Sequence, residues 1–167
     1  MVPTVLAIAA LFTLTGGVIA QTMTVELRRE QHGAWLTICY RDRIDDSVWC
    51  NLITRLKGSR SDMPRIIIAT TLPRENPSLR IWPPDNSLPV GGMVRSSKGP
   101  AERLIDCNRS SCSVANEDAT IEDLIAGGPF LVRIDTRMSG QFEGEADLTG
   151  FKAGLDAWRK AVKELKN

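Results

Sequence analysis

The chain has few of the residues from which most catalytic and metal sites are built. One of its 167 residues is histidine, His32, and one is tyrosine. It has no G-x-S-x-G motif, no glycine-rich loop with a phosphate-binding lysine and no C-x-x-C pair. A nucleophile needs a base within hydrogen-bonding reach, so a Ser-His or Cys-His mechanism would depend on His32 alone. We place His32 in a mobile N-terminal segment, residues 21–33, and therefore expect no catalytic residue and no enzyme.

A strong net charge is also missing. The chain has 21 basic and 20 acidic residues, a balance of +1, which gives no net field to attract nucleic acid. The acidic pairs Asp45-Asp46, Glu117-Asp118 and Glu122-Asp123 fall in predicted turns or first helical turns, where carboxylates favour the local structure. The cysteines lack the close paired spacing of a zinc site. We therefore expect no metal, no cofactor and no nucleic-acid partner.

Long hydrophobic runs are absent except at the N-terminus. Residues 1–20, MVPTVLAIAALFTLTGGVIA, carry no charged side chain and end in small or β-branched residues before Gln21. This is the layout of a secretory signal peptide that is cleaved after residue 20. The alternative is a retained N-terminal anchor, because the apolar stretch is nearly long enough to span a bilayer. The rest of the chain then has at most a peripheral association with a membrane.

The four cysteines, Cys39, Cys50, Cys107 and Cys112, are expected to form two disulfides if the chain is exported. Three pairings are open, and local pattern favours neighbours. The apolar runs AWLTICY and VWCNLITRL flank a charged turn and predict a β-hairpin that Cys39–Cys50 would link. Cys107 and Cys112 flank the polar turn NRSS between two further short strands, which predicts a second linked hairpin.

The remaining pattern predicts a mainly β domain over residues 34–167. Short strands separated by turns, among them Arg65–Thr70 and Met93–Ser96, favour an antiparallel β-sandwich or barrel-like fold. A short helix is expected from Thr120, with Asp123 completing a capping box, to Gly127-Gly128. A C-terminal amphipathic helix is expected to pack on the sheet through one apolar stripe. The stripe consists of Leu148, Phe151, Leu155, Trp158, Val162 and Leu165.

The order of these features resembles the invasion-associated locus B family of exported bacterial proteins. The resemblance covers roughly residues 35–165 and rests on an ordered set of elements: Trp35 four residues before Cys39, then Cys50, the stretch Leu88-Pro89-Val90-Gly91-Gly92, the pair Cys107 and Cys112, the short helix ending at Gly127-Gly128, and Leu148-Thr149-Gly150-Phe151 opening the final helix. It implies a β-sandwich-like domain and a periplasmic or outer-membrane-associated location in a Gram-negative bacterium, or secretion from one. It also implies a link to host-cell entry in pathogenic relatives, and it implies no catalytic residue.

The sequence therefore favours a non-catalytic envelope protein that acts by contact with another envelope protein or a host surface. Binding residues tend to lie on loops that a rigid scaffold holds. The candidate contact surface is the aromatic and proline-bearing stretch Trp82, Pro83, Pro84, Asp85 and Asn86. The alternative function is a periplasmic small-ligand binder or inhibitor with a sandwich pocket near Trp82.

Overall fold

The computed structural model describes residues 23–58, 64–72, 77–84 and 87–166. The predicted signal peptide, and Asp85 and Asn86 of the predicted contact surface, lie outside these residues. The described chain is mainly β, as expected. Its elements are β1 (Thr24–His32), β2 (Trp35–Asp42), β3 (Val48–Arg55), β4 (Arg65–Leu72), β5 (Ser78–Trp82), β6 (Pro89–Ser96), β7 (Ala101–Ile105), β8 (Cys112–Val114), α1 (Glu117–Ala126), β9 (Phe130–Thr136), β10 (Gly140–Glu145) and α2 (Phe151–Lys166).

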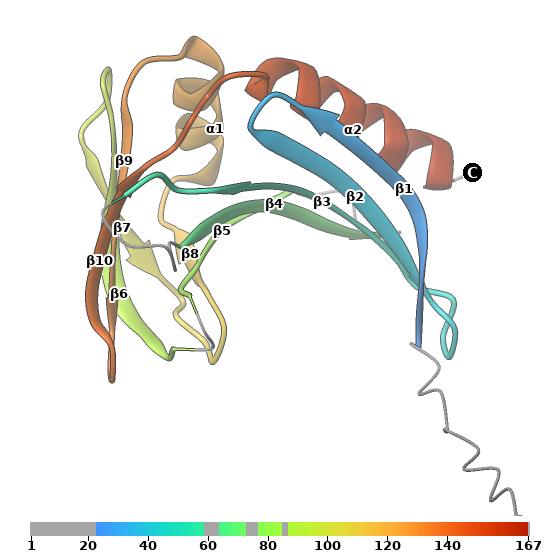
Figure 1. Ribbon diagram of the computed structural model, residues 1–167, viewed down its shortest axis with the longest axis horizontal. Coiled ribbons are helices and arrows are strands. Elements are labelled where there is room, and N and C mark those ends of the chain that lie inside the picture. The colour runs from blue at the N-terminus through green and yellow to red at the C-terminus, as the bar shows by residue number, and fades with distance from the viewer. Residues whose placement is uncertain (1–22, 59–63, 73–76, 85–86, 167) are drawn as a thin grey trace, which may run out of the picture.

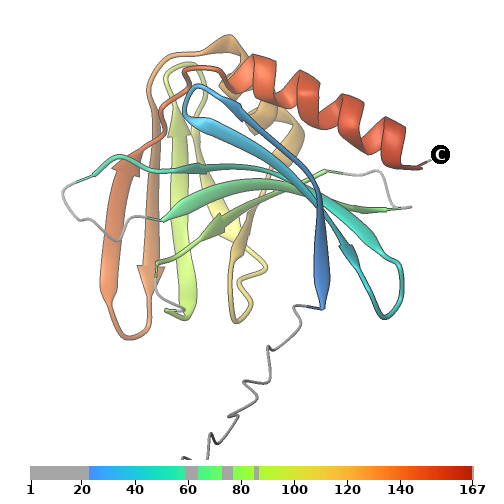
Figure 2. The ribbon, with the colours of Figure 1, turned by 45° about the vertical axis from the view of Figure 1, so that its right-hand side comes forward.

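All ten strands belong to one antiparallel sheet in the order β1-β2-β3-β4-β5-β8-β7-β6-β9-β10. The sheet bends so strongly that β3, β4 and β5 run across β6, β9 and β10 (Figures 1 and 2). Lys57, just beyond β3, exchanges two backbone hydrogen bonds of 2.8 Å with Glu145 at the end of β10. This bridge brings β3 back to the far edge of the sheet, so the expected barrel-like sandwich is confirmed.

One continuous core fills the inner face of this bent sheet. It contains Trp35, the Cys39–Cys50 disulfide and Ile66 from the first strands, and Val132 and Phe142 from the last. The amphipathic helix α2 lies along β1 and β2 (Figure 1), and its apolar stripe enters the same core, as predicted. Trp158 is 4% exposed and donates a hydrogen bond from Nε1 to the Cys50 carbonyl over 3.1 Å.

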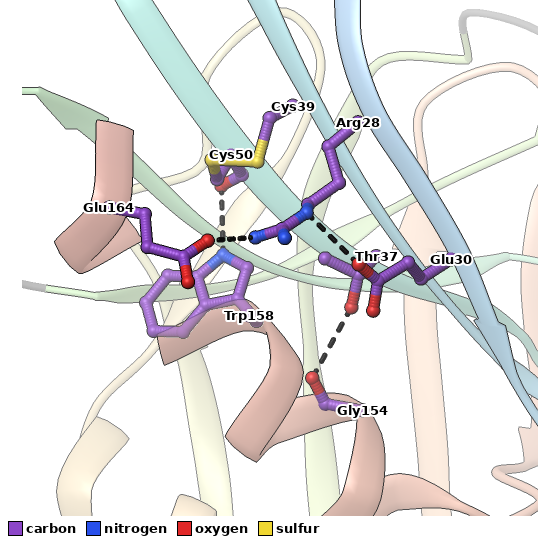
Figure 3. Close-up of a disulfide and its surroundings, with 8 residues drawn as sticks. All are labelled: Arg28, Glu30, Thr37, Cys39, Cys50, Gly154, Trp158 and Glu164. Atoms are coloured by element: carbon purple, nitrogen blue, oxygen red, sulfur yellow. Dashed lines mark hydrogen bonds and ion pairs between the residues drawn. A yellow bond between two sulfur atoms is a disulfide. The ribbon is translucent and has the colours of Figure 1, made fainter. Parts of the chain in front are cut away.

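Polar contacts align α2 with the first hairpin (Figure 3). Thr37 donates its hydroxyl to the Gly154 carbonyl over 3.3 Å. The Arg28 guanidinium on β1 lies 2.9 Å from both Glu30 and Glu164, so it connects the edge strand to the last turns of α2. These contacts fix the position of the helix along the sheet.

The opening of α2 explains part of the sequence pattern Leu148-Thr149-Gly150-Phe151. Gly150 has φ +81°, and a Cβ there would lie 2.2 Å from the His32 carbonyl oxygen. Only glycine fits both the left-handed backbone and this close approach. The next residue, Phe151, is buried with its ring centroid 4.7 Å from that of Trp35. The pattern thus holds the β1–β2 turn against the helix.

The N-terminal segment differs from the expectation. We expected residues 21–33 to be mobile, and for Thr24–His32 this is wrong, because these residues form β1 and pair with β2 along its length. His32 consequently lies at the end of a strand, with Nε2 3.5 Å from a Glu30 carboxylate oxygen. The charged residues that concealed the strand suit a sheet edge, where charges discourage pairing with another chain.

Three element boundaries also differ. The strand expected at Met93–Ser96 begins at Pro89, and the final helix begins at Phe151 rather than Leu148. The short helix begins at Glu117 rather than Thr120, so Thr120 does not cap it. Thr120 instead donates its hydroxyl to the Asn116 carbonyl over 2.7 Å, and Asp123 accepts from Ser96. The predicted capping box is therefore wrong, because the acidic first turn of the helix extends one turn further back.

Candidate contact surface

The outer face of β2–β5, opposite the core, is unexpectedly apolar. The register places Leu36, Ile53 and Ile67 in one row across β2, β3 and β4, with Ile38 beside them on β2. Ile38 and Ile67 are only 2% and 6% exposed, yet they do not belong to the core cluster. These side chains therefore form a second, smaller apolar layer on the outside of the sheet.

Three aromatic side chains extend this layer. Tyr40 on β2 and Trp49 on β3 face each other with ring centroids 5.8 Å apart. Trp82, at the end of β5, pairs with Arg65 and lies diagonally from Ile67. The only tyrosine and two of the four tryptophans of the chain thus lie on the outside of one sheet. We call this surface the outer aromatic face, and it consists of Leu36, Ile38, Tyr40, Trp49, Ile53, Ile67 and Trp82.

Arginines surround the outer aromatic face. Arg55 and Arg65 pair across β3 and β4, and Arg80 is the neighbour of Ile67 on β5. Arg29 on β1 makes two hydrogen bonds to the Glu26 carboxylate, and this contact lowers the pKa of Glu26 and raises that of Arg29. Large aromatic rings and guanidinium groups are enriched at protein-binding hot spots.

Three of the five residues predicted as the contact surface are among the described residues, and of these three only Trp82 lies on this face. Trp82 is 38% exposed, Pro83 is half-buried and Pro84 is buried. Trp82 therefore marks the rim of the surface. A signal for the rest was present in Leu36, Ile38 and Tyr40, which alternate with the core residues of β2. A strand that is apolar on both faces is expected to be covered on both.

Two grooves lie elsewhere on the molecule. One, of about 590 Å³, lies on the outer face of β6, β9 and β10, where Met93, Leu131 and Arg133 meet Glu143 and Glu145. Within the described residues, the Arg133 Nε there is buried without a hydrogen-bond acceptor.

The other groove, of about 640 Å³, lies between β5, β8 and the start of α1 and includes Arg80, Ile105 and Glu117. Burial raises the pKa of Glu117 against the opposing effects of nearby hydrogen bonds and Arg80. Neither groove includes Trp82, so a pocket near Trp82 is not among them.

In the part of the chain that the structure describes, no three His, Cys, Asp or Glu side chains are grouped as metal ligands would be. No helix within the described ranges has the length and apolar character needed to cross a membrane.

Comparison with known proteins supports the fold. No family model matches the chain, and no curated protein matches its sequence. The crystal structure of invasion associated protein b from Bartonella henselae is similar, with a TM-score of 0.50 over 82% of this chain and 99% of that one. The two sequences are 14% identical, so the similarity concerns the fold alone.

Proposed function

We propose that this chain is a non-catalytic exported protein of the cell envelope, and that it acts by contact through its outer aromatic face. The observation that carries the proposal is a sheet face with a row of aliphatic side chains, three aromatic rings and a border of arginines. Aromatic rings on such a face contribute most to the free energy of binding when a partner buries them away from water. A complementary partner would be an envelope or host-surface protein with an apolar, acidic patch.

Two further observations support export. Both disulfides join neighbouring cysteines, and no cysteine of the described residues is free. Such bonds persist in the periplasm and outside the cell. The similarity in fold to invasion associated protein b of Bartonella henselae is consistent with an exported protein.

The test is crosslinking in the native envelope, followed by mass spectrometry of the captured proteins. The test variant is Trp82→Ala with Arg65→Ala, because both side chains are exposed on this face. We expect capture of one reproducible partner, with affinity reduced about 30-fold or more in the variant, as for a hot-spot residue. Unchanged capture by a variant with native thermal stability would contradict the proposal.

Leu131→Ala is the matched control. Leu131 is 49% exposed but lies on the outer face of β9, within the groove of about 590 Å³. We expect it to leave capture unchanged. The groove of about 590 Å³ has an apolar floor, and Arg133 Nε there has no hydrogen-bond acceptor. These two features favour this groove for the second candidate function, a periplasmic small-ligand binder or inhibitor. Recovery of the protein alone, with a bound small molecule that Leu131→Ala displaces, would support this second function instead.

A further inference from the structure

The most exposed hydrophobic side chains of the described residues come from four separate places in the sequence. Four large ones are more than half exposed: Met23 at 64%, Ile44 at 74%, Val90 at 55% and Met138 at 85%. Met23 precedes β1, Ile44 lies in the β2–β3 turn, Val90 lies at the start of β6 and Met138 lies in the β9–β10 turn. We call these four side chains the apolar tips.

The fold brings all four tips to one end of the molecule. The start of β1, the β2–β3 turn, the start of β6 and the β9–β10 turn reach a common level at the end opposite α1 and α2 (Figures 1 and 2). Hydrogen bonds connect them in pairs. Arg43 next to Ile44 donates its backbone N–H to the Met23 carbonyl, and Arg137 next to Met138 donates to the Leu88 carbonyl, both over 2.9 Å.

The arrangement suits a fluid partner better than a protein. A protein interface needs a contiguous packed centre, whereas the tips project singly from four separate places in the fold. Polar residues separate them, such as Asp42, Asp45 and Asp46 around Ile44. The boundary between headgroups and acyl chains accepts apolar side chains one at a time, and the affinity increases with the apolar area inserted.

The N-terminal residues and the charges beside the tips also favour a lipid bilayer as the partner. Residues 1–22 carry no charged side chain and join the domain at Met23, which is itself a tip. A retained leader would hold this end of the domain against the bilayer, and after cleavage the tips would act alone. Arg43 and Arg137 beside the tips are outnumbered by Asp42, Asp45 and Asp46. The surface therefore suits zwitterionic lipid rather than anionic lipid.

We propose that this end of the domain rests on a lipid bilayer, with the apolar tips inserted into its interface. The contact is separate from the protein contact proposed for the outer aromatic face. It would set the orientation of the domain, with α1 and α2 directed away from the bilayer.

Vesicle flotation tests the inference with the chain that begins at Gln21. This chain keeps every described residue and lacks the apolar leader, and export with a cleavable leader lets its disulfides form. We expect it to float with phosphatidylcholine vesicles. Ile44→Asp and Met138→Asp should each reduce partitioning about tenfold, because each removes one apolar side chain from the interface. Ile44→Leu and Met138→Leu should retain it.

Leu131→Asp is the matched control, because Leu131 lies near the opposite end of β9 from Met138 and is also about half exposed. We expect normal flotation for this variant. No flotation of the parent chain would overturn the proposal, as would an equal loss in Leu131→Asp. Flotation only with anionic vesicles, unchanged in the tip variants, would also overturn it and would assign lipid binding to the arginines. Native thermal stability in each variant shows that the domain stays folded.

Discussion

The two disulfide-linked hairpins show that one kind of bond can serve two structural purposes. Cys39 and Cys50 lie directly opposite each other on β2 and β3, and both are fully buried in the core beneath α2. Cys107 and Cys112 close the short connection between β7 and β8, where Cys107 is half-buried. Both residues of the first bond lie in the long-range core, whereas the second bond closes a local turn and only its Cys112 is fully buried in that core.

The hydrogen bonds around the two disulfides also differ. The Cys50 carbonyl accepts the hydrogen bond from Trp158, more than one hundred residues further along the chain. At the second hairpin, Asn108 Oδ1 accepts from the backbone N–H groups of Ser110 and Ser111 and from the Ser110 hydroxyl. The first bond therefore depends on the docking of α2, and the second turn has hydrogen bonds of its own.

The largest effect is expected from Trp158→Ala, which removes the helix residue that joins α2 to the first hairpin. The side chain is 4% exposed, so its loss leaves a cavity and removes the hydrogen bond to the Cys50 carbonyl. We expect the free energy of unfolding to fall by about 3–5 kcal/mol. Urea denaturation measures this change. A cost below about 1 kcal/mol would show that α2 contributes little to the stability of the hairpin.

The next largest effect separates the two disulfides directly. Replacing Cys39 and Cys50 with alanine should cost about 3 kcal/mol, because the bond closes the longer loop and both side chains fill the core. Replacing Cys107 and Cys112 should cost less, about 2 kcal/mol, because the loop is shorter, only Cys112 is fully buried and Asn108 still orders the turn. Equal costs in urea denaturation would remove the distinction between the hairpins.

Sequence pattern predicted the linked hairpins and α2 because the pattern is strong there. Cys39 and Cys50 lie on apolar runs around a charged turn, and the stripe through Trp158 has clear helical spacing. It did not predict that residues 24–32 are an ordered strand of the sheet, because the contact of Arg28 with Glu164 on α2 and the pairing with β2 are long-range. Local composition records only that the strand is charged.

The outer aromatic face also depends on long-range pairing that local sequence does not record. The stretch at Trp82 was visible as a motif, whereas Tyr40, Trp49 and Ile67 come to lie on one face only through the register of three strands. The apolar tips lie still further beyond sequence reasoning. Met23 and Met138 are single residues in turns far apart in the chain, and the fold alone places them at one end.

The smallest expected effect is a pH-dependent change in stability, and it involves Asp147 near the first hairpin. Asp147 precedes α2, and its carboxylate lies 2.6 Å from Lys57 Nζ and accepts the Thr149 N–H over 2.9 Å. The contact with Lys57, followed by those with Thr149, holds the pKa of Asp147 well below its usual value of about 3.9. The Asp147 carbonyl also accepts from Trp35 Nε1 over 2.8 Å, so this segment contacts the core.

The direction in which stability changes with pH follows from the linkage between protonation and folding. A carboxyl whose pKa is lowered by folding stabilises the folded state at pH values above its unfolded pKa. That contribution is lost as the pH falls below about 4 towards the lowered value. Asp147→Asn should therefore lower thermal stability at pH 7 and leave it nearly unchanged near the acid limit of folding. The turn around Asn108 has no titrating group among its hydrogen bonds, so Asn108→Ala should lower stability by the same amount at both pH values. A pH-independent effect of Asp147→Asn would show that the ion pair with Lys57 does not contribute to the docking of α2.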